Sequence, residues 1–258
     1  MKKIIALSLA LAMSAVLFAG CKTKDQVAIN SAEDLNGLAI GCQGGTTGET
    51  WVLENCTEKK PIAYKSGMEA ALDLKNGKID AVVLDELPAK AIVEKNPALK
   101  ILDIQFAKEE YAIAVAKGNQ ELIDSINATI KKMEEDGSYK ALADSFIPAD
   151  GKIVIPSEIP TSGDKVLKMG TNAEFQPFEY VEGKDIVGFD ITMSQYIAAN
   201  HGSKLEVINM AFDSLIASLQ AGTVDFVAAG MSVNEERLKN VDFSDPYYES
   251  EQVIIVRK

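Results

Sequence analysis

Arg237 is the first residue of this chain whose type and position suggest chemistry. Only two of the 26 basic residues are arginines. Arg237 lies in GMSVNEERLKN, just after an apolar stretch that predicts a strand. A guanidinium can hold a carboxylate through two parallel hydrogen bonds, which a lysine cannot do. The spacing fits a carboxylate clamp and a charged surface helix equally well, so both interpretations stay open at this point.

Two segments in the first half of the chain carry complementary groups. GGTTGETW places Thr46 and Thr47 at a glycine-rich turn before a predicted helix, where free backbone N–H groups and the helix dipole favour an anion. Asp85 ends the apolar stretch DAVVLD, and an acid that faces a crevice there would attract a cation. Together with Arg237, these residues match the two charged ends of an α-amino acid.

The elements that must position these residues occur twice. EAALDLKNGKIDAVVLD (69–85) and SLIASLQAGTVDFVAAG (214–230) align without a gap, and each predicts a helix, a glycine stop and a short apolar strand. Repeated units of this kind predict an α/β protein with two similar lobes. We expect each lobe to hold a mostly parallel sheet flanked by helices, with a cleft between the lobes at the carboxyl ends of the strands.

The repeat also suggests the boundaries of the lobes. We expect residues 24–117 and 251–258 to form one lobe, and residues 118–250 to form the other. The segment 147–164 is rich in proline and predicts a surface linker within the second lobe. The final stretch QVIIVRK predicts a buried strand that needs a partner, which we expect inside the first lobe.

The first twenty residues predict a secretory signal peptide, because two lysines precede an uncharged apolar run and small residues. FAGC resembles the lipobox of bacterial lipoproteins, which predicts lipid on Cys21; the alternative is an ordinary signal peptide with an incidental cysteine. No later stretch reaches the roughly 18 apolar residues of a spanning helix, so we expect membrane contact through lipid only. The net charge of −12 argues against nucleic-acid binding.

The remaining cysteines and the single histidine predict no metal site and no cofactor. Cys42 and Cys56 are expected at opposite ends of a strand–helix unit, too far apart for a disulfide. His201 has no cysteine, histidine or paired acid near it in the sequence.

Several motifs together resemble the type II extracytoplasmic solute-binding proteins of ABC transporters for polar amino acids. The resemblance covers nearly all of residues 25–258 and rests on GTNAEFQPFEY, IVGFDI, AGMSVNEER, VDFSDPYYES, GCQGGTTGETW and DAVVLDELPA. Their order differs from that of the family, whose members run from GTNAEF through QVIIVRK into GTTGE. The resemblance therefore implies a circularly permuted chain.

The resemblance also implies roles for individual residues. Arg237 would clamp the α-carboxylate of the ligand with help from Ser232 and Thr47, and Asp85 would take the ammonium with help from the Gly230 carbonyl. Phe175 and Phe212 would sandwich the ligand side chain, the alternative being that both are plain core. Asn172 stands where binders of basic amino acids often have Asp, which favours a neutral polar ligand. Asp190 is expected to cap a helix.

The implied function is capture of a free amino acid by lobe closure and delivery to an ABC permease. The protein would be a monomer outside the cytoplasm, anchored to the bacterial membrane by lipid. An alternative is an enzyme on the same fold, similar to cyclohexadienyl dehydratases, for which Glu174 is the nearest candidate acid. A third class, the sensor module of a receptor, lacks an attached transmembrane or signalling segment.

Overall fold

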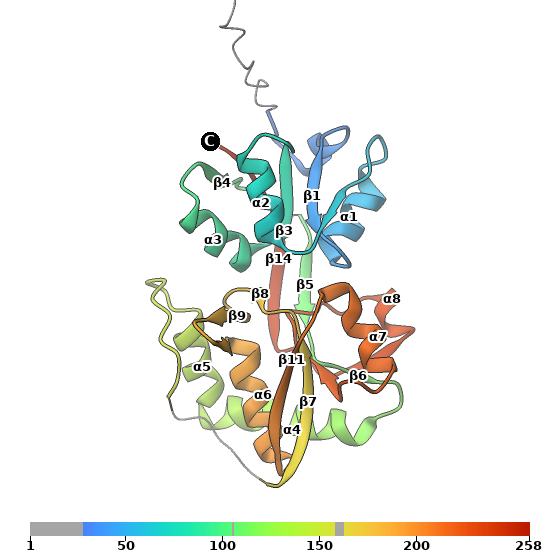
Figure 1. Cartoon of the computed structure of the whole chain (residues 1–258), viewed down its shortest axis with the longest axis vertical. Coiled ribbons are helices and arrows are strands. Elements are labelled where there is room, and N and C mark those ends of the chain that lie inside the picture. The colour runs from blue at the N-terminus through green and yellow to red at the C-terminus, as the bar shows by residue number, and fades with distance from the viewer. Residues whose placement is uncertain (1–27, 105, 158–162) are drawn as a thin grey trace, which may run out of the picture.

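The chain folds into two α/β lobes placed end to end, as the computed structural model shows (Figure 1). The structure describes residues 28–104, 106–157 and 163–258. The predicted signal peptide and Cys21 lie outside the described residues. Within the described part, no helix combines the length and the hydrophobicity that a membrane crossing requires.

The first lobe contains a six-stranded sheet with three helices. Its strand order is β2-β1-β3-β14-β4, and β5 pairs with β14. The strands are β1 (Ile40–Gln43), β2 (Ile62–Tyr64), β3 (Ala81–Asp85), β4 (Leu99–Ile101), β5 (Lys108–Tyr111) and β14 (Tyr248–Arg257). The helices are α1 (Thr47–Asn55), α2 (Gly67–Lys75) and α3 (Glu86–Lys95), and a 3₁₀ turn spans Ala32–Leu35.

The C-terminal strand β14 lies in the middle of this sheet, between β3 and β4. Val253 pairs with Leu84 and Val256 with Lys100, in both cases antiparallel. Ile254 and Ile255 are fully buried, so the strand is part of the core. The expected partner of QVIIVRK is thereby confirmed.

The second lobe is built on a five-stranded sheet of order β11-β7-β12-β6-β13. Its strands are β6 (Ala114–Ala116), β7 (Lys165–Thr171), β11 (Ser203–Asn209), β12 (Phe226–Val227) and β13 (Val241–Phe243), and β8 (Glu174–Phe175), β9 (Glu179–Glu182) and β10 (Asp185–Val187) form a small separate sheet. The helices are α4 (Gln120–Asp136), α5 (Ser138–Phe146), α6 (Phe189–Asn200), α7 (Leu215–Gln220) and α8 (Glu235–Leu238), and a 3₁₀ turn spans Phe212–Ser214.

The two strands β5 and β14 run side by side where the chain passes between the lobes (Figure 1). Tyr248 of β14 pairs with Tyr111 of β5, directly before β6 joins the second sheet. The expected boundary after residue 117 is therefore wrong by a few residues, because β6 pairs with β12 and β13. The sequence suggested one continuous segment here, since no glycine or proline marks the crossing.

Both sheets are mixed, which differs from the expected mostly parallel arrangement. In the first lobe β1 is parallel to β2 and β3, whereas β14 is antiparallel to its three partners. In the second lobe β6 is antiparallel to β12 and β13. The antiparallel strands are those that follow a passage between the lobes, so they enter their sheets from the opposite end.

The aligned Gly-x-[Ile/Val]-Asp motif performs the same task in each lobe. Gly77 and Gly222 end their helices at φ of 73° and 70°, a left-handed conformation that favours glycine. Asp80 accepts a hydrogen bond from the Ala39 N–H at 3.0 Å, and Asp225 accepts one from the Lys168 N–H at 2.7 Å. Each acid thus ties the start of its strand to the neighbouring strand, which explains why the motif repeats.

The two cysteines of the first lobe are free and buried, as expected. Cys42 lies in β1 and Cys56 follows α1. Burial raises the pKa of Cys42 to about 12, so its thiol stays protonated and unreactive at neutral pH.

Candidate functional site

A small pocket between the lobes gathers most of the predicted ligand residues. Residues predicted from the sequence that line it are Thr47, Asp85, Phe175, Phe212, Gly230, Ser232 and Arg237. Gln43 and Thr46 also line it. The cavity measures about 10 Å³, roughly the space that one water needs, which shows that the lobes meet closely here. An amino acid can therefore bind only if the lobes part.

Arg237 is buried in the wall that the second lobe contributes. The Asn234 side chain caps the short helix α8 by accepting from the Arg237 N–H at 2.8 Å. The guanidinium donates to the Ser232 carbonyl at 2.6 Å and, across the cleft, to the Gly45 carbonyl at 2.9 Å. It also lies 5.4 Å from the centre of the Phe212 ring. Burial lowers the pKa of Arg237, while nearby Glu109 and Asp85 oppose this shift.

Asp85 is buried in the opposite wall, at the end of β3. Its carboxylate accepts hydrogen bonds from the Tyr111 hydroxyl and, at 2.7 Å, from Gln252 Nε2. Burial raises the pKa of Asp85 to about 7, and the charge of Glu109 adds to the rise. The hydrogen bonds from Tyr111 and Gln252 and the charge of Arg237 act in the opposite direction. The two walls thus hold one buried cation and one buried acid.

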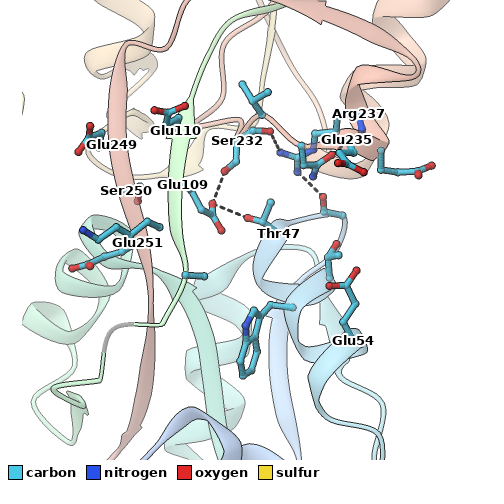
Figure 2. A pocket seen from close by; sticks show the side chains of 18 of the residues that line it. Thr47, Glu54, Glu109, Glu110, Ser232, Glu235, Arg237, Glu249, Ser250 and Glu251 are labelled. Atoms are coloured by element: carbon cyan, nitrogen blue, oxygen red, sulfur yellow. Dashed lines mark hydrogen bonds between the residues drawn. The ribbon is translucent and has the colours of Figure 1, made fainter.

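Thr47 and Ser232 approach each other from the two lobes and share one acceptor. Thr47 opens helix α1, where Thr46 caps the helix by accepting from the Glu49 N–H at 3.3 Å. The Thr47 hydroxyl donates to Glu109 Oε2 at 2.8 Å, and the Ser232 hydroxyl donates to the same oxygen (Figure 2). Two hydroxyls beside a guanidinium form a site for a carboxylate, and here a carboxylate of the protein lies between them.

The aromatic residues and Gly230 shape one side of the pocket. Gly230 adopts φ of 51°, and a Cβ there would come within 2.6 Å of the Phe175 ring. Only glycine lets the backbone approach the ring so closely. Phe175 is buried and also packs against Phe178, whose ring centre lies 6.1 Å away.

Asn172 lies behind the pocket and does not line it. Its side chain donates to the Met210 carbonyl at 2.8 Å and accepts from Gln43 Nε2 at 2.8 Å across the lobes. Gln43 is 2% exposed, and its Oε1 has no hydrogen-bond partner among the described residues. Sequence reasoning missed Gln43, although its place at the end of strand β1, next to GGTTGE, was a usable signal.

A pair of buried acids supports Gly230 from the core of the second lobe. Asp190 Oδ2 accepts from the Gly230 N–H at 2.9 Å and from the Tyr247 hydroxyl at 2.7 Å. Burial and the adjacent Asp190 raise the pKa of Glu179 well above its usual range, which favours the neutral form of Glu179 beside Asp190. The expectation that Asp190 caps α6 is wrong, because the N-cap is Gly188 and Asp190 points to Gly230 instead.

A larger crevice of about 1310 Å³ opens beside the pocket and is strongly acidic (Figure 2). Thr47, Ser232 and Arg237 line both spaces. The glutamates of the crevice are Glu54, Glu86, Glu109, Glu110, Glu235, Glu236, Glu249 and Glu251, against Lys108, Lys239 and Arg237 as its basic residues. A crevice with one dominant sign of charge concentrates ions of the opposite sign, so this one attracts cations.

The C-terminal part of the chain matches a known family. Residues 167–258 match the bacterial extracellular solute-binding proteins, family 3. This part of the chain is similar to that family. The arginine-binding extracellular protein ArtP of Bacillus subtilis is 47% identical over 97 residues, which are 38% of this chain and 38% of that protein. The L-cystine-binding protein TcyJ of Escherichia coli K12 is 32% identical over 130 residues, 50% of this chain and 49% of that protein.

Other similar proteins carry related names. The ABC transporter arginine-binding protein 1 of Escherichia coli K12 is 32% identical over 120 residues, 45% of this chain and 49% of that protein. A solved structure, the arginine-bound form of domain 1 from TmArgBP, is 40% identical with a TM-score of 0.32 and covers 36% of this chain and 80% of that one. The matches span less than half of the three curated relatives.

These matches confirm the resemblance to type II solute-binding proteins for polar amino acids. The three curated relatives are named as binding proteins, in agreement with the expectation of a binding protein rather than an enzyme. Glu174, the acid considered for an enzyme, is exposed and lies on a groove beyond Phe175, outside the small pocket.

Proposed function

We propose that this protein captures a free amino acid between its two lobes and delivers it to an ABC permease. The observation that carries the proposal is the pairing of a buried guanidinium, Arg237, with a buried carboxyl, Asp85, on opposite walls of one pocket. An α-amino acid presents the complementary charges. A ligand that lacked either end group would leave one buried charge without a partner, which is costly and provides selectivity.

Two observations bear on the side chain of the ligand and point in different directions. Two of the relatives are named for arginine, and the acidic crevice would attract a cation. Asn172, in place of an acid, acts only through its hydrogen bond to Gln43, which lines the pocket, and this neutral pair favours a neutral polar side chain. The free Oε1 of Gln43 offers an acceptor to either kind. Arginine and glutamine are therefore the first ligands to compare.

Isothermal titration with the twenty L-amino acids at pH 8 tests the proposal. We expect at least one of them to bind, and we expect loss of binding for the analogues of that ligand that lack the α-carboxylate or the α-amino group. If none binds at millimolar concentration, or if either analogue binds as tightly as the parent, the proposed pairing with Arg237 and Asp85 is wrong.

The protein would act outside the cytoplasm as a monomer, with lipid on Cys21 as its membrane anchor. FAGC at the end of the predicted signal supports this proposal. Labelling with a fatty-acid analogue should mark the wild type and not the variant Cys21→Ser, which lacks the thiol that would carry lipid. The labelled protein should fractionate with membranes, because two or more acyl chains give stable anchoring. A wild type that stays unlabelled and fractionates with soluble proteins would contradict lipidation.

We further propose that the order of the chain is a circular permutation of the family order. The proposal is supported by the central place of β14 in the first sheet, and by Ile29 and Val256 contacting one apolar cluster in the same lobe. A rearranged chain that runs from Lys165 to Lys258, continues at Asp25 and ends at Ile147 should fold and bind the same amino acid with similar affinity. Only loop closures change, and their entropy varies slowly with loop length. A folded rearranged chain without binding would refute the permutation.

A further inference from the structure

Glu109 is an acid of the crossing strand β5 that connects both walls of the cleft. Its Oε2 accepts from the Thr47 hydroxyl of the first lobe, at 2.8 Å, and from the Ser232 hydroxyl of the second lobe (Figure 2). Its Oε1 accepts from Gln252 Nε2 at 3.1 Å. Both oxygens of this carboxylate therefore accept hydrogen bonds, and the donors come from three segments that are far apart in the sequence.

The two hydroxyls that hold Glu109 are the ones proposed to hold the ligand carboxylate. Arg237, the proposed clamp, is attracted by the charge of Glu109. One pair of hydroxyl donors cannot hold two carboxylates at hydrogen-bond distance, because the two like charges would meet. We infer that Glu109 is an internal competitor for the ligand carboxylate, and that the same contacts form a latch that holds the lobes together. This inference rests on the proposed function.

Displacement of Glu109 also prepares the other end of the site. Glu109 and Asp85 accept from the same Gln252 amide nitrogen, at 3.1 and 2.7 Å, so two acids lie close together. The charge of Glu109 contributes to the raised pKa of Asp85. When a ligand carboxylate moves Glu109 towards the crevice, Asp85 loses this repulsion and ionises more readily, which the ligand ammonium requires.

The neighbouring Glu110 provides a matched control. It lies on the same strand and lines the same crevice, yet it is exposed and its side chain points away from Thr47 and Ser232 (Figure 2). Glu109→Ala and Glu110→Ala remove the same charge from adjacent positions. Only the first removes the hydrogen bonds from Thr47 and Ser232 that link the lobes through Glu109.

The experiment measures lobe separation and affinity in the full chain. Small-angle X-ray scattering without amino acid should give a larger radius of gyration for Glu109→Ala than for the wild type or Glu110→Ala. Titration should show tighter amino-acid binding for Glu109→Ala, on the order of tenfold, because a ligand no longer has to displace the competitor. Glu109→Gln, which keeps the size and loses the charge, should change both quantities in the same direction by less.

Two results would overturn the inference. Weaker amino-acid binding by Glu109→Ala would make Glu109 a ligand-binding residue instead of a competitor. Unchanged affinity and unchanged scattering, with circular dichroism showing a folded protein, would leave it without either role. If Glu109→Ala does not fold, the affinity and the scattering of Glu109→Gln test the inference in its place. If the wild type and Glu109→Ala both bind no amino acid, the proposed function fails, whereas the scattering comparison still tests the latch.

Discussion

Two pairs of acidic side chains lie near the pocket, and the two pairs differ in their hydrogen-bond donors and in their burial. In the cleft, Asp85 and Glu109 both accept hydrogen bonds, and the Gln252 amide bridges them. In the core of the second lobe, Glu179 and Asp190 are fully buried and face each other, and Asp190 takes the Gly230 N–H and the Tyr247 hydroxyl. Glu109 of the cleft pair lines the open crevice, whereas neither acid of the core pair lines it.

The difference shows that burial separates acids whose hydrogen bonds a ligand can replace from acids whose hydrogen bonds are a fixed part of the fold. The donors around Glu109 are hydroxyls and an amide that can turn towards a ligand, so its contacts can be replaced. The donors around Asp190 include a backbone N–H that cannot turn, and burial beside Asp190 raises the pKa of Glu179, which favours its neutral form and lessens the repulsion between the two acids. The core pair should therefore determine stability, and the cleft pair should determine binding.

The largest expected effect breaks the core pair. Asp190→Ala leaves the Gly230 N–H and the Tyr247 hydroxyl without their acceptor, and unmade hydrogen bonds of this kind cost roughly 1–3 kcal/mol each. We expect the free energy of unfolding to fall by about 3–5 kcal/mol in urea denaturation. The exposed Asp185 gives the control, since Asp185→Ala should stay within about 0.5 kcal/mol of the wild type. Equal losses for the two variants would remove the special role of the core pair.

The next effect concerns the cation of the cleft. Arg237→Ala should weaken amino-acid binding by roughly tenfold to a hundredfold, because charge-assisted hydrogen bonds contribute about 1.5–3 kcal/mol. Titration with the best ligand measures this change. Lys239→Ala, at an exposed lysine of the same crevice, should leave the affinity nearly unchanged. An Arg237→Ala protein that binds like the wild type would place the carboxylate elsewhere.

The effect of pH on binding follows from Asp85. A ligand ammonium needs the ionised carboxylate, and the pKa of Asp85 is about 7, so affinity should rise with pH and level off above that value. Between pH 6 and pH 8 we expect about a tenfold gain. Asp85→Asn should weaken binding and flatten the profile. A wild-type profile that is flat, or that rises towards low pH, would contradict this role.

The last effect is on stability, and its sign follows from the raised pKa of Asp85. Burial moves the pKa of Asp85 from 3.8 to about 7, so the folded protein binds this proton more tightly than the unfolded chain. The contribution of Asp85 to stability is therefore full below about pH 4 and is lost as pH rises to 7. Comparison of urea midpoints for wild type and Asp85→Asn at pH 5 and pH 8 checks the sign, with the wild type losing more relative to the variant at pH 8.

The sequence alone predicted the repeated parts of the fold and the two oppositely charged residues of the site. The motif around Gly77 and Gly222 predicted a helix, a turn and a strand in both lobes, since local conformation and apolar periodicity determine these elements. Arg237 stood out as one of only two arginines, and Asp85 as the acid that ends an apolar strand. The mixed direction of the sheets and the crossing before Ala114 were missed, because strand pairing depends on partners far away in the chain.

What only the tertiary structure decided is which polar groups meet. From the sequence, Asp190 was expected to cap a helix, and neither Glu109 nor Gln43 was singled out. Each acquires its role from a partner at a distance in sequence: Glu109 from Thr47 and Ser232, Gln43 from Asn172, and Asp190 from Gly230. Residue type determines which hydrogen bonds a side chain can donate or accept. The packing of the two lobes determines which residues lie within hydrogen-bond distance and how far water is excluded from them.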